Sequence, residues 1–192
     1  MDRAMIDVIE ELGVWVAAAG FVDVHLGDVE LLMRQMKRLP AMAVQLLNAD
    51  LVAGWWHLFF AALNAVKAMR DGTNRSRELG MEFLLYASAQ RQISKAIRLM
   101  GVKPETGRVA LVVIADSREK AETAIKQASK LIGGKRDDKI LELTKDKADN
   151  IKQAFGITDG EIEAQTAEGK ADLLDALANL VIEHVALLAA ET

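Results

Sequence analysis

A short polar segment between two helical stretches carries the side chains best suited to bind a ligand. The sequence EFLLYASAQRQISKAIRLMG (residues 82–101) begins as an apolar helix, passes through polar residues and resumes as a second helix. We expect Ser88 to cap the second helix, which would place Gln90, Arg91 and Gln92 at its N-terminus. Free backbone N–H groups and the helix dipole favour an anion there. This QRQ turn is a candidate phosphate site, and the alternative is that its side chains only cap the helix.

Basic residues continue along the second helix. Arg91, Lys95 and Arg98 follow an i, i+4, i+7 spacing, which predicts a basic stripe on one side of the helix. Apolar residues would pack beneath this stripe, namely Ile93, Ala96, Ile97 and Met100. The same helix could therefore pack into the core on one side and bind a ligand on the other.

The charge distribution supports a local basic surface on an acidic chain. The 192 residues have a formal charge of −4, which argues against general coating of nucleic acid. Between Lys67 and Arg108, however, nine basic residues meet four acidic ones, a local charge of +5, and the remainder carries −9. This separation could attract a polyanion to one side of the molecule. An ordinary solvated surface is the alternative.

The residues needed for enzyme chemistry are scarce. The chain has no cysteine, and His25, His57 and His184 are too scattered to suggest a metal site. Ser117 and Lys120 match a Ser-x-x-Lys pattern, but helix capping explains the serine. We expect no catalytic residues, no metal and no cofactor. The lack of cysteine fits a reducing compartment, so we expect a cytoplasmic protein.

The elements that position these residues alternate between strands and helices. The sequence predicts an α/β fold (mixed α+β), a single domain over residues 1–192 with a small sheet of about four strands covered by helices. Sheet order is not predicted. Strands are expected at 14–24, 42–47, 108–116 and 139–144, and helices at 30–39, 55–69, 75–87, 90–100, 118–132, 146–155 and 171–190. Asp28 and Ser117 are expected to cap helices, and Thr158 with Glu161 matches the capping-box spacing for one more turn or helix. The apolar run at residues 13–22 is too short to span a bilayer, so we expect no membrane anchor.

The last predicted helix has one broad apolar stripe that includes His184, which favours a core or edge position for this histidine. Val185 lies at the margin of the stripe, and Ile182 points away from it. We predict Ile182 and Val185 as a partner-binding surface, although an apolar residue off the core side is often simply exposed.

Four sequence blocks resemble a known family, the small tRNA-binding subunit of the KEOPS complex, which is homologous to the PRPK-binding protein of animals. These blocks are AVQLLNADLVAG (residues 43–54), EFLLYASAQRQISKAIRLMGVK (82–103), LIGG with DDKILEL (131–143) and VIEHVALL (181–188). The second block is the most specific, whereas residues 1–40 match less well. The chain looks most like archaeal members.

The resemblance implies a mixed α/β protein without catalysis of its own. KEOPS installs threonylcarbamoyladenosine in tRNA, and this subunit would bind the kinase-like ATPase subunit and the single-stranded 3′ CCA end of tRNA. Neither DNA nor a membrane would be a partner. The rival prediction is a protein-only adaptor that activates the kinase without contacting RNA; an enzyme acting on a small molecule is a distant third.

The resemblance also assigns residues to the RNA. Asn48 and Asp50 of the Asn-Ala-Asp turn and the QRQ turn would contact the RNA end, although turn formation alone could explain the first pair. Arg91, Lys95 and Arg98 would contact phosphates, extended by Arg70, Arg75 and Arg77. Trp55 and Trp56 lie outside the recognised pattern and fit core packing better than base stacking.

One position departs from the family pattern. Related chains commonly carry glycine where this chain has Ala89. A left-handed backbone there would cost alanine about 1 kcal/mol more than glycine. The geometry of the QRQ turn therefore depends on what backbone conformation Ala89 adopts.

Overall fold

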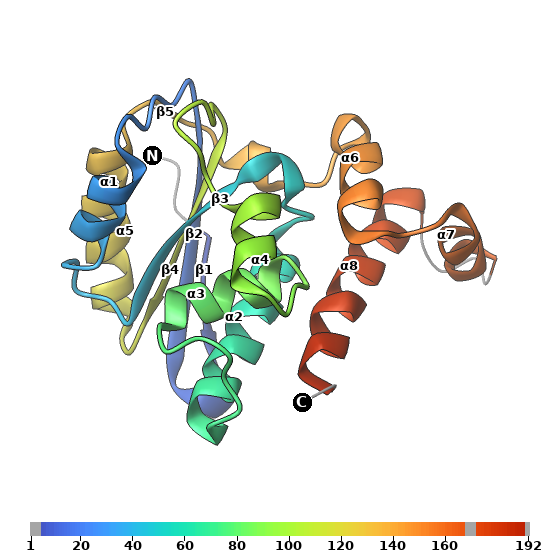
Figure 1. Ribbon diagram of the computed structural model, residues 1–192, viewed down its shortest axis with the longest axis horizontal. Coiled ribbons are helices and arrows are strands. Elements are labelled where there is room, and N and C mark those ends of the chain that lie inside the picture. Colours follow the sequence, from blue (N-terminus) through green and yellow to red (C-terminus); the bar gives the residue numbers. More distant parts are fainter. Residues whose placement is uncertain (1–4, 168–171, 191–192) are drawn as a thin grey trace.

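A mixed α/β architecture places a single sheet between helices in the computed structural model, which describes residues 5–167 and 172–190 (Figure 1). Within these residues the strands are β1 (Met5–Ile9), β2 (Val14–Val22), β3 (Ala43–Asn48), β4 (Val109–Ala115) and β5 (Lys135–Arg136). The α-helices are α1 (Val29–Met36), α2 (Trp55–Asp71), α3 (Leu79–Ala87), α4 (Ile93–Met100), α5 (Arg118–Ile132), α6 (Lys145–Phe155), α7 (Asp159–Thr166) and α8 (Leu173–Ala190). Short 3-10 helices η1 (Glu10–Leu12), η2 (Ala49–Leu51) and η3 (Asp138–Leu141) complete the described chain.

The sheet is antiparallel, with strand order β1-β2-β4-β3 and β5 paired to the far end of β2. β2 and β4 are central, with Trp15 opposite Ala115 and Phe21 opposite Val109. Each is covered on both sides, which explains why they appear as continuous apolar runs in the sequence. The predicted fold class is confirmed. Three of the four predicted strands correspond to β2, β3 and β4, whereas β1 and β5 were not foreseen.

Two core clusters fill the two sides of the sheet. Alternate residues of β2 divide between them: Val14, Val16 and Ala18 pack toward α2 and α3, and Ala17, Ala19 and Phe21 pack toward α1 and α5. Figure 1 shows α1 and α5 on one side of the strands and α2, α3 and α4 on the other. The C-terminal helices α6, α7 and α8 extend this second layer.

Several predicted helix starts are confirmed by their caps. The Asp28 side chain accepts a hydrogen bond from the Leu31 backbone N–H at 2.9 Å, and Ser117 accepts one from Lys120 at 3.3 Å. Thr158 and Glu161 form a full capping box at the start of α7. These caps account for the boundaries because each satisfies a backbone N–H that has no helical partner.

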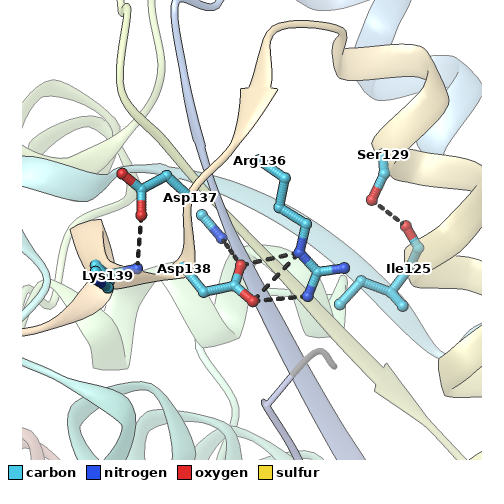
Figure 2. Close-up of polar contacts among 7 residues, drawn as sticks. Ile125, Ser129, Arg136, Asp137, Asp138 and Lys139 are labelled. Atoms are coloured by element: carbon cyan, nitrogen blue, oxygen red, sulfur yellow. Dashed lines mark hydrogen bonds and ion pairs between the residues drawn. The ribbon is translucent and has the colours of Figure 1, made fainter. Parts of the chain in front are cut away.

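The predicted strand at residues 139–144 is wrong. The chain there forms η3, whose first turn is capped by the Asp137 carboxylate on the Lys139 N–H. The Asp138 carboxylate meanwhile accepts hydrogen bonds from the Arg136 guanidinium, as Figure 2 shows, and from the Gly20 N–H at 2.9 Å. A Cβ at Gly20 would lie 2.5 Å from the Asp137 carbonyl oxygen. Glycine in β2 thus lets η3 pack directly on the sheet, and the local aspartates turn the chain.

The last helix, α8, begins at Leu173; the predicted first residue, Ala171, lies outside the described residues. By length and composition α8 is apolar enough to cross a membrane. Its Ala176, Leu177, Leu180, Val181, Val185 and Leu188 are nevertheless buried in the protein core. Core helices of folded domains often pass the same composition test. α8 packs on the core along its length and has exposed apolar residues at both ends, Leu173 and Leu187.

Candidate nucleic-acid interface

The QRQ turn is set by the end of α3. The Gln90 N–H donates to the Leu85 carbonyl at 3.0 Å and the Ala89 N–H to the Tyr86 carbonyl at 2.9 Å, the hydrogen-bond pattern of a Schellman motif. Ser88 is fully buried, and its hydroxyl donates to the Leu84 carbonyl at 2.8 Å. The prediction that Ser88 caps the following helix is therefore wrong: Ser88 ends α3. Gln92 occupies the N-cap position of α4 without a side-chain capping bond.

Ala89 adopts the left-handed conformation expected from the family pattern, with φ of +49°. Alanine is strained there because its Cβ approaches the following carbonyl. Replacing Ala89 by glycine is expected to raise the free energy of unfolding by about 1 kcal/mol. Chemical denaturation of both proteins measures this difference. Ala164→Gly, at an exposed position inside α7, is the matched control, and it should lower the free energy of unfolding by about 1 kcal/mol. An equal decrease in stability in both variants would contradict strain at Ala89.

A hollow of about 420 Å³ lies between the QRQ turn and α8. Ala89, the QRQ turn and Lys95 line one side, and His184, Leu187 and Leu188 line the other. Arg91, Gln92 and Lys95 are exposed, and Gln90 is half-buried. This arrangement gathers two amide side chains, two cations and apolar groups around a single opening.

The basic stripe begins at the QRQ turn rather than within a helix. Because α4 starts at Ile93, only Lys95 and Arg98 lie on it, and both are exposed. Ala96 and Met100 pack into the core as predicted. Ile93 and Ile97 do not: they are 41% and 44% exposed. Helix α4 thus presents mixed basic and apolar groups to its surroundings.

The three arginines predicted to extend the row of phosphate contacts, Arg70, Arg75 and Arg77, lie in different places. Arg70 and Arg77 line a separate apolar groove of about 810 Å³ between α1, β3, α2 and α3, away from the QRQ hollow. The Arg70 guanidinium donates to the Leu12 carbonyl. Arg75 is half-buried, and its guanidinium donates to the Leu188 carbonyl at 3.3 Å. Arg75 therefore fixes the C-terminal end of α8.

A buried carboxylate holds the loop that carries Arg75. Glu82 is fully buried and accepts backbone N–H bonds from Arg75 at 2.9 Å and Ser76 at 2.7 Å. A carboxylate with two backbone donors replaces part of its lost hydration in this way. This role was not predicted, because a glutamate in a helix usually lies at the surface.

Asn48 and Asp50 lie at the other end of α4 from the QRQ turn. Gly101, which follows α4, pairs with Leu47 in an isolated bridge, so the eight residues of α4, roughly 12 Å, separate the two turns. The Asn48 side chain accepts the Asp50 N–H at 3.1 Å, and the Asp50 carboxylate pairs with Arg108 at 2.8 Å. These bonds match the turn-forming alternative, and neither residue lines the QRQ hollow. Their RNA contact stays a prediction.

His57 connects the start of α2 to the end of α3. Its Nδ1 accepts the Ala53 N–H at 3.0 Å, so Nε2 carries the proton and donates to the Ala87 carbonyl at 2.7 Å. The ring is fully buried and packs edge-on against Phe155. Burial lowers the pKa of His57 to about 4. The neutral imidazole thus helps to place the residues immediately before the QRQ turn.

Lys147 of α6 is a buried lysine whose ammonium donates to three backbone carbonyl oxygens. Its ammonium donates to Val52 at 2.5 Å, Ile140 at 2.9 Å and Glu142 at 3.0 Å. The side chain joins the segment after η2 to η3, and desolvation lowers its pKa to about 8. Lys147 was not foreseen because an isolated lysine in an amphipathic helix usually lies in solvent.

The two α8 residues predicted to bind a partner differ in exposure. Val185 is fully buried within the core of this chain, so the prediction that its side chain faces a partner is wrong. The cause is that α8 packs against α2 and α6, which widens its buried side beyond one stripe. Ile182 is half-buried and lines a hollow of about 280 Å³ with Trp55, Trp56 and the α8 residues Asp175, Ala178 and Asn179.

The two tryptophans differ. Trp55 is half-buried and packs on Phe59, whereas Trp56 is 54% exposed and contacts Phe59 edge-on and Phe60 at a tilt. The core interpretation therefore fits Trp55 better than Trp56. Trp56 and Ile182 form an aromatic and aliphatic surface where α2 begins.

The described residues contain no cluster of side chains suited to bind a metal ion. Across 5–167 and 172–190, no group of three or more His, Asp or Glu side chains could hold a metal ion. What these residues offer a ligand is hydrogen bonding, positive charge and apolar contact.

Comparison with known proteins identifies the family. Residues 24–189 match the model of the family described as kinase binding protein CGI-121. The chain is also 35% identical over 113 residues to the regulatory protein Cgi121 of Methanocaldococcus jannaschii, which covers 59% of this chain and 70% of that protein. The chain belongs to the CGI-121 family. This confirms the resemblance drawn from the four sequence blocks, including its archaeal character.

Proposed function

We propose that this chain is a non-catalytic, cytoplasmic KEOPS subunit that binds the single-stranded 3′ CCA end of tRNA through the QRQ turn and α4. The observation that carries the proposal is the QRQ hollow, where Gln90 and Gln92 stand beside Arg91 and Lys95. Unpaired RNA is recognised by hydrogen bonds to base edges and by anchoring of its phosphates, and these side chains supply both. The surrounding charge of +5 between Lys67 and Arg108 favours approach of a polyanion.

The second part of the proposal is contact with the kinase-like ATPase subunit. The exposed surface of Trp56 and the neighbouring Ile182 is the support within the structure, since aromatic residues are enriched at interface centres. The description of the family as kinase binding proteins agrees with such a partner. In binding measurements with the purified kinase-like subunit of an archaeal KEOPS complex, Ile182→Asp should bind markedly more weakly than wild type.

Charge reversal at Lys95 tests the RNA contact. Lys95→Glu is expected to weaken tRNA binding about tenfold and to reduce its salt dependence, because one phosphate contact is lost. Fluorescence titration at two salt concentrations measures both effects. Lys126→Glu makes the same charge change at an exposed position of α5, on the other side of the sheet, and should bind as wild type does. If both variants weaken tRNA binding equally, the change in net charge explains the effect, which would contradict a site at the QRQ turn.

The rival function is a kinase adaptor that does not contact RNA. It predicts that Lys95→Glu leaves kinase binding intact and that no variant changes tRNA binding. Measuring both partners with the same variants therefore separates the two functions.

A further inference from the structure

The apolar groove of about 810 Å³ beside β3 is larger than the QRQ hollow and shares none of its lining residues. We call it the β3 groove. Its lining includes five of the eight methionines of the chain: Met33, Met36, Met42, Met69 and Met81. Methionine is flexible and polarisable, and it is common at surfaces that adapt to an apolar ligand. The volume of the groove lies in the range of small-molecule sites, about 300–1,000 Å³.

The β3 groove follows the edge strand of the sheet, and Figure 1 shows β3 between α1 on one side and α3 and α4 on the other. Gly80, in the first turn of α3, lies beside the start of β3: a Cβ at Gly80 would be 3.8 Å from that of Ala43. Gly101, which follows α4, pairs with Leu47 near the end of the strand. Four residue steps along an antiparallel strand span about 14 Å. The groove therefore has two ends, one beside the start of α3 and the other beside the end of α4.

Ion pairing leaves one cation free at the α3 end. The Glu78 carboxylate, just before α3, lies 2.7 Å from the ammonium of Lys37 at the end of α1, so this pair joins the two walls of the groove. The neighbouring Arg77 is exposed and forms no ion pair within residues 5–167 and 172–190. Arg70, which also lines the groove, donates to the Leu12 carbonyl. The Arg77 guanidinium is thus available to bind a single negative charge.

The α4 end of the groove is apolar. Ile97 and Val102 line it, and Ile97 is 44% exposed. The last charged residue of the lining, Glu30, lies in the first turn of α1, about two turns before Lys37. The β3 groove therefore offers one cation, a methionine-rich wall and an open apolar end.

We propose that the β3 groove binds a free long-chain carboxylate, with the carboxylate on Arg77 and the apolar chain along the methionines toward Ile97. A guanidinium binds a carboxylate through two parallel hydrogen bonds. One free arginine matches the single charge of a carboxylate better than the charge of about −1.5 to −2 on a phosphate monoester. An extended peptide fits less well, because methionine side chains cannot satisfy the N–H and C=O groups of its backbone.

Calorimetric titration of the purified chain with decanoate and with 1-decanol tests the inference. Both probes are used below the concentrations at which they aggregate, and they share the apolar chain but differ in the charge of the head group. Wild type is expected to bind one decanoate per chain, about tenfold more tightly than decanol, because a charge-assisted contact is added to the same apolar burial.

Two variants separate the head group from the chain. Arg77→Glu should remove the preference for decanoate and leave the affinity for decanol unchanged. Ile97→Asp should weaken binding of both probes about tenfold, because it places a charge beside the apolar chain. The matched controls are Lys126→Glu, an exposed charge reversal on α5, and Ile93→Asp, one turn before Ile97 on α4. Ile93 is 41% exposed and does not line the groove, so both controls should bind the probes as wild type does.

The results support or overturn the site as follows from this design. Loss of the decanoate preference in Arg77→Glu, with weaker binding of both probes by Ile97→Asp alone, supports it. If wild type binds neither probe saturably, the inference is overturned and the groove is left to a protein partner. Equal affinity of wild type for the two probes, or equal weakening by Ile93→Asp and Ile97→Asp, also overturns it. The titrations contain no RNA, so the proposed function stands or falls separately.

Discussion

Replacing Lys147 by methionine is expected to lower the free energy of unfolding by about 3 kcal/mol at pH 7. Methionine keeps an unbranched side chain, one heavy atom shorter, but leaves the carbonyls of Val52, Ile140 and Glu142 without this donor. Each unsatisfied buried carbonyl costs about 1–3 kcal/mol. Relief of the buried charge offsets part of that loss. Urea denaturation of the two proteins measures the difference.

Lys145 offers a matched control, since it lies two residues earlier on α6 and is exposed. Lys145→Met should change stability by less than about 0.5 kcal/mol. The pH dependence gives a second check. Because the folded pKa of Lys147 is about 8 and its ordinary value is 10.5, the unfolded chain binds more protons between these values. Stability should therefore gain a rising contribution over this pH window in wild type, and Lys147→Met should lack it. A stability of Lys147→Met equal to wild type would contradict the three-carbonyl role.

Acid should destabilise the protein by about 3 kcal/mol through His57 alone as the pH falls from 6.5 to 4. The folded pKa is about 4, against 6.5 for an exposed histidine, because burial disfavours the imidazolium. Below pH 6.5 the unfolded chain takes up a proton that the folded chain refuses, so stability falls. The Nδ1 atom also accepts the Ala53 N–H and cannot be protonated without breaking that bond. Unfolding free energies measured between pH 7 and pH 4 give the size of the effect.

The His57→Gln variant isolates this contribution. Its amide can donate to Ala87 and accept from Ala53 but does not titrate, so its loss of stability between pH 7 and pH 4 should be about 3 kcal/mol smaller than that of wild type. His25 is exposed, and His25→Asn should keep the wild-type profile. Parallel pH profiles for wild type and His57→Gln would show that another group causes the acid loss.

Much of the fold follows from local patterns. The β-branched run at Val109–Ala115 and the capped starts of α1, α5 and α7 were predicted because short-range forces determine them. The strand prediction for residues 139–144 was wrong because apolar and polar residues alternate there as they do in a strand. Gly20, a residue distant in the sequence, allows this segment to pack on the sheet as η3. Strand β1 was missed because its stability comes from pairing with β2. Sheet order depends on such pairings and was not predictable from periodicity.

The site was predictable in residue type but not in assembly. Polar and basic side chains at the QRQ turn were identified from their spacing. The position of α8 on the other side of the hollow was not predicted. This helix lies about ninety residues further along the chain, and its docking depends on contacts such as that of Arg75 with Leu188. Val185 was misassigned for the same reason: helical periodicity cannot show that neighbouring helices cover both margins of an apolar stripe.

The central claim is that the QRQ turn and α4 bind the 3′ end of tRNA. Its most direct test is the affinity of the purified wild-type chain for one tRNA with and without its CCA end, measured at the same salt concentration. We predict that removing CCA weakens binding at least tenfold, because the unpaired nucleotides that contact the QRQ hollow are gone. Equal affinities for the two RNAs would contradict the account and favour an adaptor that contacts only protein.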